Sequence, residues 1–176
     1  DVTSYDYDAP INEYGLATPK YHELRAMLAK YSDKPLPEIP EAPMPIISIP
    51  EFEMDYFAPM FENMPSPVKI DHMMTMEEFD QGWGSILYRT TVNAVDGQSL
   101  LQVFEPHDYA QVFVNGDFIG AMDRRVRENT LVLPSLKQGD TLDILVEAMG
   151  RINFGRAIKD FKGITDSVVL NGTRLD

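Results

Sequence analysis

Two tyrosines near the start of the chain are the residues whose type and spacing best suit the recognition of a ligand. Tyr5 and Tyr7 lie in residues 2–7, a short segment rich in β-forming residues that we expect to be a strand. Because successive side chains of a strand point to opposite faces, Thr3, Tyr5 and Tyr7 share one face. A phenol provides a flat ring for stacking and a hydroxyl that both donates and accepts hydrogen bonds. The alternative is that both tyrosines are ordinary core aromatics of that strand.

Carboxylate pairs and histidines give weaker indications of chemistry. Glu77 and Glu78 follow Thr75 in the pattern of a helix capping box, and Glu51 and Glu53 fit the solvated edge of an extended segment. Three histidines are scattered without the spacing of a metal site: His22, His72 and His107. Cysteine is absent, so the chain can form neither a disulfide nor a thiolate zinc site. These patterns predict structural roles, with no metal site.

The net charge limits the partners that the chain can attract. It is −13 at pH 7, and such a chain repels phosphate backbones and anionic lipid, which argues against nucleic acid and membrane surfaces. A length of 176 residues and an apolar content of 44% are ordinary for a globular protein with a real core. No run of 18 apolar residues is present, so we expect no transmembrane helix. Residues 1–5 lack the features of a signal peptide and suggest a cut inside a longer chain.

Three regions position these residues. In residues 1–32, the expected strand is followed by a helix that begins at Thr18 and Pro19, an N-cap and a proline at the first helical position. Apolar residues then recur at helical spacing: Tyr21, Leu24, Met27, Leu28 and Tyr31. A lone strand and helix cannot bury two such faces, so we expect them to belong to a larger α/β body.

Residues 33–67 form a proline-rich linker. Nine of the thirteen prolines lie here, which leaves few backbone donors for a regular ladder. Two stretches, residues 46–49 and 51–57, could still pair as edge strands. The apolar content is too high for a free tether, so we expect the linker to run along a protein surface.

Residues 68–176 change to a period of two, which indicates strands. We expect them at residues 85–93, 100–105, 109–115, 118–122, 130–133, 141–149 and 164–170. Asn115-Gly116 and Asn171-Gly172 provide turn chemistry between strands. Asn171-Gly172-Thr173 is also a glycosylation sequon, but we favour the turn. About seven short strands over a hundred residues predict a β-sandwich.

Two further features have competing interpretations. Trp83 is the only tryptophan and could be a sugar platform, but we favour packing in the core. Residues 150–155 place Arg151 between two glycines, and this loop could shape a pocket rim. We favour a structural role for it, with Arg151 bonded to a carboxylate such as that of Glu147 or Asp160.

Three stretches resemble the β-galactosidases of glycoside hydrolase family 35. They are residues 3–10 (TSYDYDAP), 82–91 (GWGSILYRTT) and 142–155 (LDILVEAMGRINFG). Residues 108–120 also fit the family, as a hairpin of its sandwich domain. The resemblance covers nearly the whole chain in order, most loosely in the linker. It implies a mainly β chain, a galactose-binding-like jelly-roll β-sandwich preceded by the last strand and helix of a (β/α)₈ barrel.

The resemblance also implies a reaction, the release of terminal β-D-galactose with retention of configuration. Such enzymes use two carboxylates. In the family both are glutamates upstream of this chain, so no catalytic residue is assigned here and the chain alone is expected to be inactive. The two tyrosines of the YDYDAP motif lie at the galactose pocket in the family and match Tyr5 and Tyr7. The implied partners are β-galactosides and the rest of the parent chain, with no cofactor and a periplasmic, secreted or lysosomal location.

Two other classes of function remain open from the sequence. The β-sandwich could be a stand-alone carbohydrate-binding module, or a structural domain that braces a barrel. An exposed apolar patch would be the mark of the structural domain.

Overall fold

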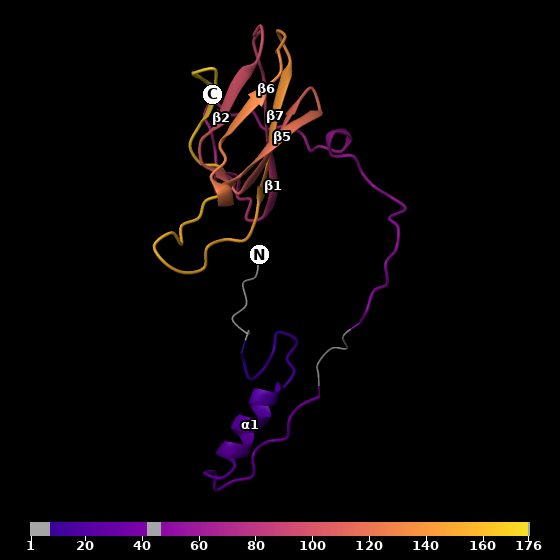
Figure 1. Ribbon diagram of the computed structural model, residues 1–176, viewed down its shortest axis with the longest axis vertical. Helices are drawn as coiled ribbons and strands as arrows, with labels where there is room; N and C mark the ends of the chain where they lie inside the picture. Colours follow the sequence, from indigo (N-terminus) through magenta and orange to yellow (C-terminus); the bar gives the residue numbers. More distant parts are fainter. Residues whose placement is uncertain (1–7, 42–46, 176) are drawn as a thin grey trace. The chain divides into compact units, whose positions relative to one another are not determined.

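A computed structural model describes residues 8–41 and 47–175 of the chain. The chain divides into two units, one formed by residues 2–57 and the other mainly by residues 58–176, and each is described by itself (Figure 1). The strand expected over residues 2–7 lies outside the described residues, and so do Tyr5 and Tyr7.

The first unit contains one helix, α1 (Pro19–Leu28). It begins where the sequence predicts, with Thr18 extended before Pro19. The Thr18 hydroxyl does not cap the helix but donates to the carbonyl oxygens of Ala9 and Pro10. No residue of α1 is buried, which agrees with the expectation that this helix needs a larger body to cover its apolar stripe.

The proline-rich linker has no strand in its described part, residues 33–41 and 47–67. The edge strands expected at residues 46–49 and 51–57 are therefore not formed over the residues that are described. The reason is that prolines remove backbone donors and no sheet edge pairs with the segment. Within those described residues, the one regular element is the short 3₁₀ helix η1 (Met60–Glu62).

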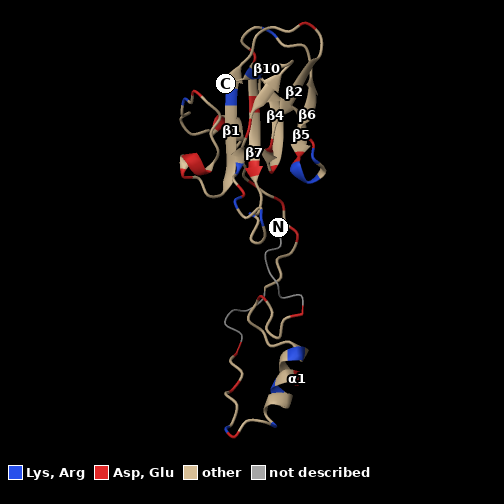
Figure 2. Cartoon of the chain, turned by 90° about the vertical axis from the view of Figure 1, so that its left-hand side faces the viewer, with Lys and Arg blue, Asp and Glu red and all other residues tan. Residues whose placement is uncertain are grey.

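The second unit is built on two four-stranded antiparallel sheets, most of whose strands are labelled in Figures 1 and 2. The first has the order β1 (Gly84–Thr91), β7 (Thr141–Ala148), β4 (Tyr109–Val114) and β5 (Asp117–Asp123). The second has the order β10 (Thr173–Leu175), β9 (Val168–Leu170), β2 (Ser99–Val103) and β6 (Thr130–Leu133). A small sheet pairs β3 (Pro106–His107) with β8 (Gly163–Ile164).

The strands occur close to where the period of two predicts them, with three differences. The strand expected at residues 164–170 is two short strands, β8 and β9, because the chain turns between Ile164 and Val168. The short strands β3 and β10 were not expected. Both contain only two or three residues, too few to show an alternation in the sequence.

Buried side chains from both large sheets form one core. Along β4, alternate residues are buried, Ala110, Val112 and Val114, while the residues between them are half-buried. From the second sheet, Leu101 and Val103 join the same cluster. This alternation agrees with the expected β-sandwich, in which the inner faces of two sheets share one core.

Local turn and cap chemistry follows the sequence. Asn115 and Gly116 both have positive φ, 52° and 87°, in the hairpin between β4 and β5. The backbone amide and hydroxyl of Thr75 both donate to the Glu78 carboxylate in front of the 3₁₀ helix η2 (Glu77–Phe79). Only the carboxylate half of the expected capping box is therefore formed, since η2 has no side-chain cap hydrogen bond at its N-cap, Met76. In the described residues, no helix is both long and apolar enough to cross a membrane.

The outer face of the first sheet receives the end of the linker. Phe61 of η1 packs edge-on against Phe113 with ring centroids 5.2 Å apart. The Arg89 guanidinium lies 5.9 Å from the Phe61 ring centroid and pairs with the fully buried carboxylate of Asp143. The linker thus contacts a protein surface at this point, as its apolar content predicts.

Candidate functional site: a buried ion network at one end of the sandwich

A fully buried lysine lies between two aspartates at one end of the first sheet. Lys162 is 0% exposed, and its ammonium lies 2.5 Å from Asp108 Oδ2 and 2.8 Å from Asp160 Oδ2. Arg124 completes the group, since its Nη1 lies 2.7 Å from Asp108 Oδ1 and 2.8 Å from Asp160 Oδ1. Two cations and two carboxylates therefore balance one another inside the protein.

Register explains why these residues meet. Tyr109, the first residue of β4, pairs with both Glu147 near the end of β7 and Asp123 at the end of β5. Asp108 and Arg124 therefore leave the sheet side by side, and the Arg124 amide donates to the Asp108 carbonyl oxygen at 3.0 Å. Arg124 opens the 3₁₀ helix η3 (Arg124–Val126), while Lys162 immediately precedes β8.

Arg151 extends this network to a third segment. Its Nη1 lies 2.5 Å from Glu77 Oε1 and 2.9 Å from the Asp160 carbonyl oxygen, and its Nη2 donates to the Gly82 carbonyl oxygen at 3.0 Å. These contacts agree with the structural role favoured for Arg151. Its carboxylate partner is Glu77, whereas the sequence suggested the side chain of Glu147 or Asp160. The sequence could not indicate Glu77, because this residue lies in a turn whose position depends on tertiary packing.

Burial and hydrogen bonds compete in setting the acidity of this network. Burial raises the pKa of Asp160, but hydrogen bonds from Lys162 and Arg124 outweigh it and hold that pKa below its ordinary value. For Glu77, burial is likewise outweighed by the Lys162 backbone amide and Arg151, and the pKa of this carboxyl is lowered. Both groups are therefore held as carboxylates near neutral pH.

A shallow hollow of about 330 Å³ lies over the network. It is lined by Asp108, Arg124, Arg125, Met149, Gly150, Ile152 and Asp160. Both of its carboxylates already bind cations, and Arg125 binds Asp123. General acid–base work needs a group that is free to exchange a proton with substrate, so this arrangement favours a structural lock over catalysis.

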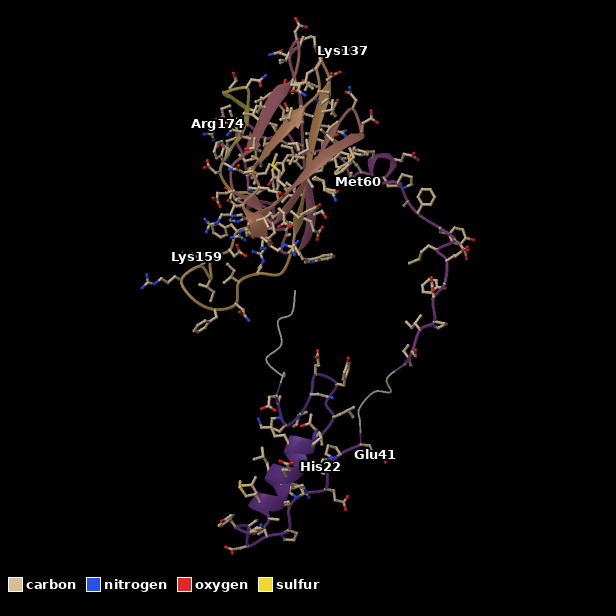
Figure 3. All side chains as sticks on the ribbon, viewed as in Figure 1. His22, Glu41, Met60, Lys137, Lys159 and Arg174 are labelled. Atoms are coloured by element: carbon tan, nitrogen blue, oxygen red, sulfur yellow. The ribbon has the colours of Figure 1, made fainter. Side chains whose placement is uncertain are left out.

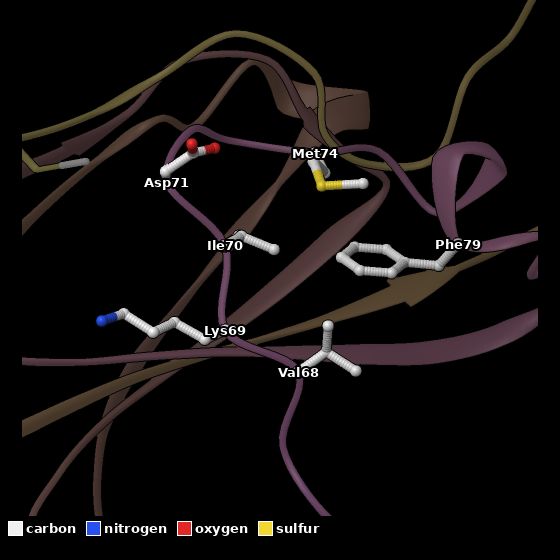
Figure 4. A pocket seen from close by; sticks show the side chains of 6 residues that line it. All are labelled: Val68, Lys69, Ile70, Asp71, Met74 and Phe79. Atoms are coloured by element: carbon white, nitrogen blue, oxygen red, sulfur yellow. The ribbon is translucent and has the colours of Figure 1, made fainter.

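A second hollow, of about 490 Å³, lies beside the segment that precedes η2 (Figure 4). It is lined by Val68, Lys69, Ile70, Asp71, Met74 and Phe79. The only carboxylate there, Asp71, is exposed and pairs with His72 at 2.6 Å. A single exposed carboxylate gives no pair for glycoside chemistry.

The other candidate residues are not brought together into a site. Glu51 and Glu53 are exposed in the extended linker. His22 lies on α1 and contacts Tyr21 edge-on. His107 is the exception, since it lies beside the ion network: its Nδ1 is 2.6 Å from the Phe161 carbonyl oxygen and 3.8 Å from Asp160 Oδ1, and its Nε2 is 3.1 Å from Glu105 Oε2. Over residues 8–41 and 47–175, no group of three or more His, Cys, Asp or Glu side chains could hold a metal ion.

The expectation that Trp83 packs in the core is wrong for this chain. Trp83 is 84% exposed. It immediately precedes β1, outside the stretch in which Ile86 and Tyr88 pack toward the core, and Gly84 between Trp83 and Ser85 has a φ of +86°, which interrupts the alternation of the strand. Its backbone is nevertheless fixed, because the Gln81 amide donates to the carbonyl oxygens of Trp83 and Ser85.

Asn171 has the role of a turn residue, as expected. Asn171 and Gly172 have positive φ, 49° and 81°, between β9 and β10. The Asn171 side chain accepts from the Leu100 amide at 2.7 Å and donates to the Ser99 hydroxyl at 3.3 Å. The side-chain amide that a glycan would use is therefore already bonded.

The ion network itself was not found from the sequence, apart from the suggestion of Asp160 for Arg151. One signal was available, since Lys162 stands between Phe161 and Gly163-Ile164 at the start of a buried segment. A charged residue in such a segment requires a buried counter-charge. Asp108 and Arg124 carry no comparable local signal.

Comparison with known proteins agrees with the architecture. Residues 73–176 match the model described as the β-galactosidase first all-β domain, and residues 1–31 match that of glycosyl hydrolases family 35. A β-galactosidase of Xanthomonas manihotis is 36% identical over 99% of this chain and 29% of its own length. A β-galactosidase-1-like protein 3 of Rattus norvegicus is 37% identical over 99% of this chain and 28% of its length.

The β-galactosidase of Homo sapiens is 36% identical over 98% of this chain and 26% of its own length, so the chain spans less than a third of these relatives. Among solved structures, a GH2 β-galacturonidase from Eisenbergiella tayi bound to glycerol has a TM-score of 0.42 and 18% identity, covering 55% of this chain and 18% of that one. This likeness is too low to carry an argument. The two matched family models show that the chain belongs to glycosyl hydrolase family 35, with the first all-β domain of β-galactosidases in residues 73–176.

Proposed function

We propose that this chain is part of a longer retaining β-galactosidase, which hydrolyses terminal non-reducing β-D-galactose residues. The observation that carries the proposal is the match of both family models, in order, together with 36–37% identity to β-galactosidases over nearly the whole chain. Within that enzyme, residues 68–176 are a non-catalytic, galactose-binding-like jelly-roll domain. Residues 1–32 are the last strand and helix of a (β/α)₈ barrel, and residues 33–67 link the two.

The absence of catalysis from the β-domain is supported by its carboxylates. A retaining glycosidase needs two carboxyl groups roughly 5–5.5 Å apart, one of which must exchange a proton with the leaving group. In the described part of the β-domain, the buried carboxylates Asp108, Asp143 and Asp160 are all bonded to Lys or Arg. We therefore place both catalytic carboxylates in a part of the enzyme that precedes this chain.

Tyr5 and Tyr7 are the residues of this chain that we assign to the galactose pocket. The assignment is supported by the alternation of residues 2–7, which predicts one shared face for both tyrosines, and by the family-35 match of residues 1–31. Barrel enzymes place their sites at the carboxyl ends of the strands, which suits a tyrosine at the end of residues 2–7. In the longer enzyme, Tyr7→Phe is expected to lower kcat/KM by about tenfold or more, the value of one transition-state hydrogen bond.

The experiment is an assay with a nitrophenyl β-galactoside. The longer gene product is expected to hydrolyse it and to retain the anomeric configuration, whereas the 176-residue chain is expected to be inactive. Activity of the purified 176-residue chain would contradict the assignment of both carboxylates to an upstream region. A longer product that is folded but inactive on β-galactosides would contradict the proposed substrate.

A further inference from the structure

Asparagine or aspartate precedes glycine at three turns of the second unit. The dipeptides are Asp96-Gly97, Asn115-Gly116 and Asn171-Gly172. Glycine has no side chain to shield its backbone nitrogen, so this nitrogen can attack the side-chain carbonyl carbon of the preceding residue. The attack closes a five-membered succinimide ring, with loss of ammonia from asparagine or of water from aspartate. All three dipeptides are exposed, so exposure alone does not decide which of them reacts.

Hydrogen bonds hold both asparagine side chains in place. Asn115 Oδ1 accepts from the Thr141 amide at 2.9 Å, and Asn115 Nδ2 donates to Asp140 Oδ1 at 3.0 Å. Asn171 is held in the same way, by a backbone amide and a side-chain hydroxyl of β2. The side-chain amide of each asparagine is thus bonded at its oxygen and at its nitrogen. Closure of a succinimide ring at either asparagine requires these two bonds to break.

Asp96 lies in an exposed turn without such bonds. In the part of the chain that the structure describes, its carboxylate forms no hydrogen bond and no ion pair. The turn is held at its ends, because Val95 forms an isolated bridge with Leu136, next to Lys137 at the tip of the second unit (Figure 3), and β2 follows the turn. Open space surrounds the Cα of Gly97. The Asp96 side chain can therefore turn toward the Gly97 nitrogen without breaking a bond.

We infer that Asp96 is the site at which this domain forms isoaspartate spontaneously. The Gly97 nitrogen attacks Cγ of the protonated carboxyl group, and the carboxyl hydroxyl leaves as water with the amide proton. Water then adds to the ring at the former backbone carbonyl carbon of Asp96, and the bond from that carbon to the Gly97 nitrogen breaks. The chain now continues through Cγ, with no net change in its atoms. The inference is independent of the proposed function, because only residues of this turn react.

The Asp96→Asn variant tests the inference, because it places three Asn-Gly dipeptides in one folded chain. The dipeptide at position 96 is expected to lose ammonia at least about tenfold faster than those at positions 115 and 171, each of which is protected by two hydrogen bonds. Peptide mass spectrometry during incubation at pH 8 measures the three rates, in the 176-residue chain and in the longer gene product. In urea the three rates are expected to become similar, because the unfolded chain holds none of the side chains.

The unchanged chain provides a second measurement. Isoaspartate has the mass of aspartate, so it is detected by enzymatic methylation of isoaspartyl peptides. It is expected at position 96, and it should form faster at pH 6 than at pH 8, because only the protonated carboxyl group can lose water. Asp96→Glu is the matched control and should form none, since its longer side chain would need a six-membered ring. Far-UV circular dichroism before and after incubation shows that the rates belong to the folded chain.

Three outcomes would overturn the inference. Equal rates at the three dipeptides of folded Asp96→Asn would show that the hydrogen bonds of Asn115 and Asn171 give no protection. Isoaspartate at position 96 in the unfolded chain but not in the folded chain would show that the turn itself prevents ring closure. A slow reaction at position 96 in the longer product alone would show that another part of the polypeptide covers this turn.

Discussion

The ammonium group of Lys162 lies 2.5 Å from the Asp108 carboxylate, although the two residues are 54 positions apart and the lysine is fully buried. The same lysine binds Asp160 and the Gly150 carbonyl oxygen, so one side chain joins the start of β4 to both ends of the 150–162 loop. A buried ion pair of this kind contributes little net energy compared with an apolar core. Its effect is to fix one arrangement of segments, since removing a partner leaves a buried charge uncompensated.

Replacement of Lys162 is therefore expected to be strongly destabilising. Lys162→Met removes the buried ammonium that both Asp108 and Asp160 contact, and we expect a loss of about 3–5 kcal/mol in the free energy of unfolding. Urea denaturation followed by far-UV circular dichroism measures it. The control is Lys159→Met in the exposed part of the same loop, expected to change stability by less than about 0.5 kcal/mol. Similar effects of the two substitutions would show that the network does not hold the fold.

Gly163 is expected to be intolerant of any side chain. Its φ is +91°, and a Cβ there would collide with the Tyr88 hydroxyl oxygen. Gly163→Ala combines backbone strain of about 1–2 kcal/mol with overpacking of about 1–3 kcal/mol. Gly172→Ala is the matched control, because Gly172 has a φ of +81° but open space around its Cα. Thermal unfolding should show a clearly larger loss for Gly163→Ala, and equal losses would remove the collision as a cause.

Tyr88 links three parts of the core through its hydroxyl. The hydroxyl donates to the Met74 carbonyl oxygen at 2.7 Å and accepts from the Ile164 amide at 3.1 Å. Burial raises the pKa of Tyr88 to about 12. Tyr88→Phe should cost about 1–3 kcal/mol of stability, because two backbone groups lose their partner. The absorbance titration of Tyr88→Phe near 295 nm should also lack the component that ionises near pH 12 in the wild-type chain. A titration curve that lost a tyrosine ionising at about pH 10 instead would show that Tyr88 ionises with the exposed tyrosines.

The lowered pKa of Glu77 predicts a pH dependence of stability. A carboxyl group with a lower pKa in the folded than in the unfolded state stabilises the fold at pH values above its unfolded pKa. For Glu77 the unfolded pKa is near 4.5, and this stabilisation is lost as the pH falls through the lower, folded pKa. The wild-type chain should therefore lose stability below about pH 4.5 more steeply than Glu77→Gln, which keeps an acceptor for the Lys162 amide but carries no charge. Urea denaturation between pH 7 and pH 3 measures both slopes. Parallel slopes would mean that Glu77 does not couple to folding.

Local patterns were sufficient for most of the β-domain. Alternation located the strands of both large sheets except β10, because a strand with one buried face must place apolar residues at every second position. Asn115-Gly116 predicted its hairpin, and Thr75 with Glu78 predicted a capped turn, since each depends only on neighbouring backbone dihedral angles and hydrogen bonds. The linker gave a less reliable signal, because its apolar alternation competes with prolines that prevent pairing.

The sequence by itself thus determined the β-sandwich class, the turns, the helix start at Pro19 and the resemblance to family 35, all of which are encoded by residues close together along the chain. Only the tertiary structure decided that Glu77 is the partner of Arg151, that Lys162 joins Asp108 and Asp160, and that Trp83 faces solvent. The physical reason is that these contacts depend on the register of distant strands. Register fixes which chain ends leave a sheet side by side, and no local period records it.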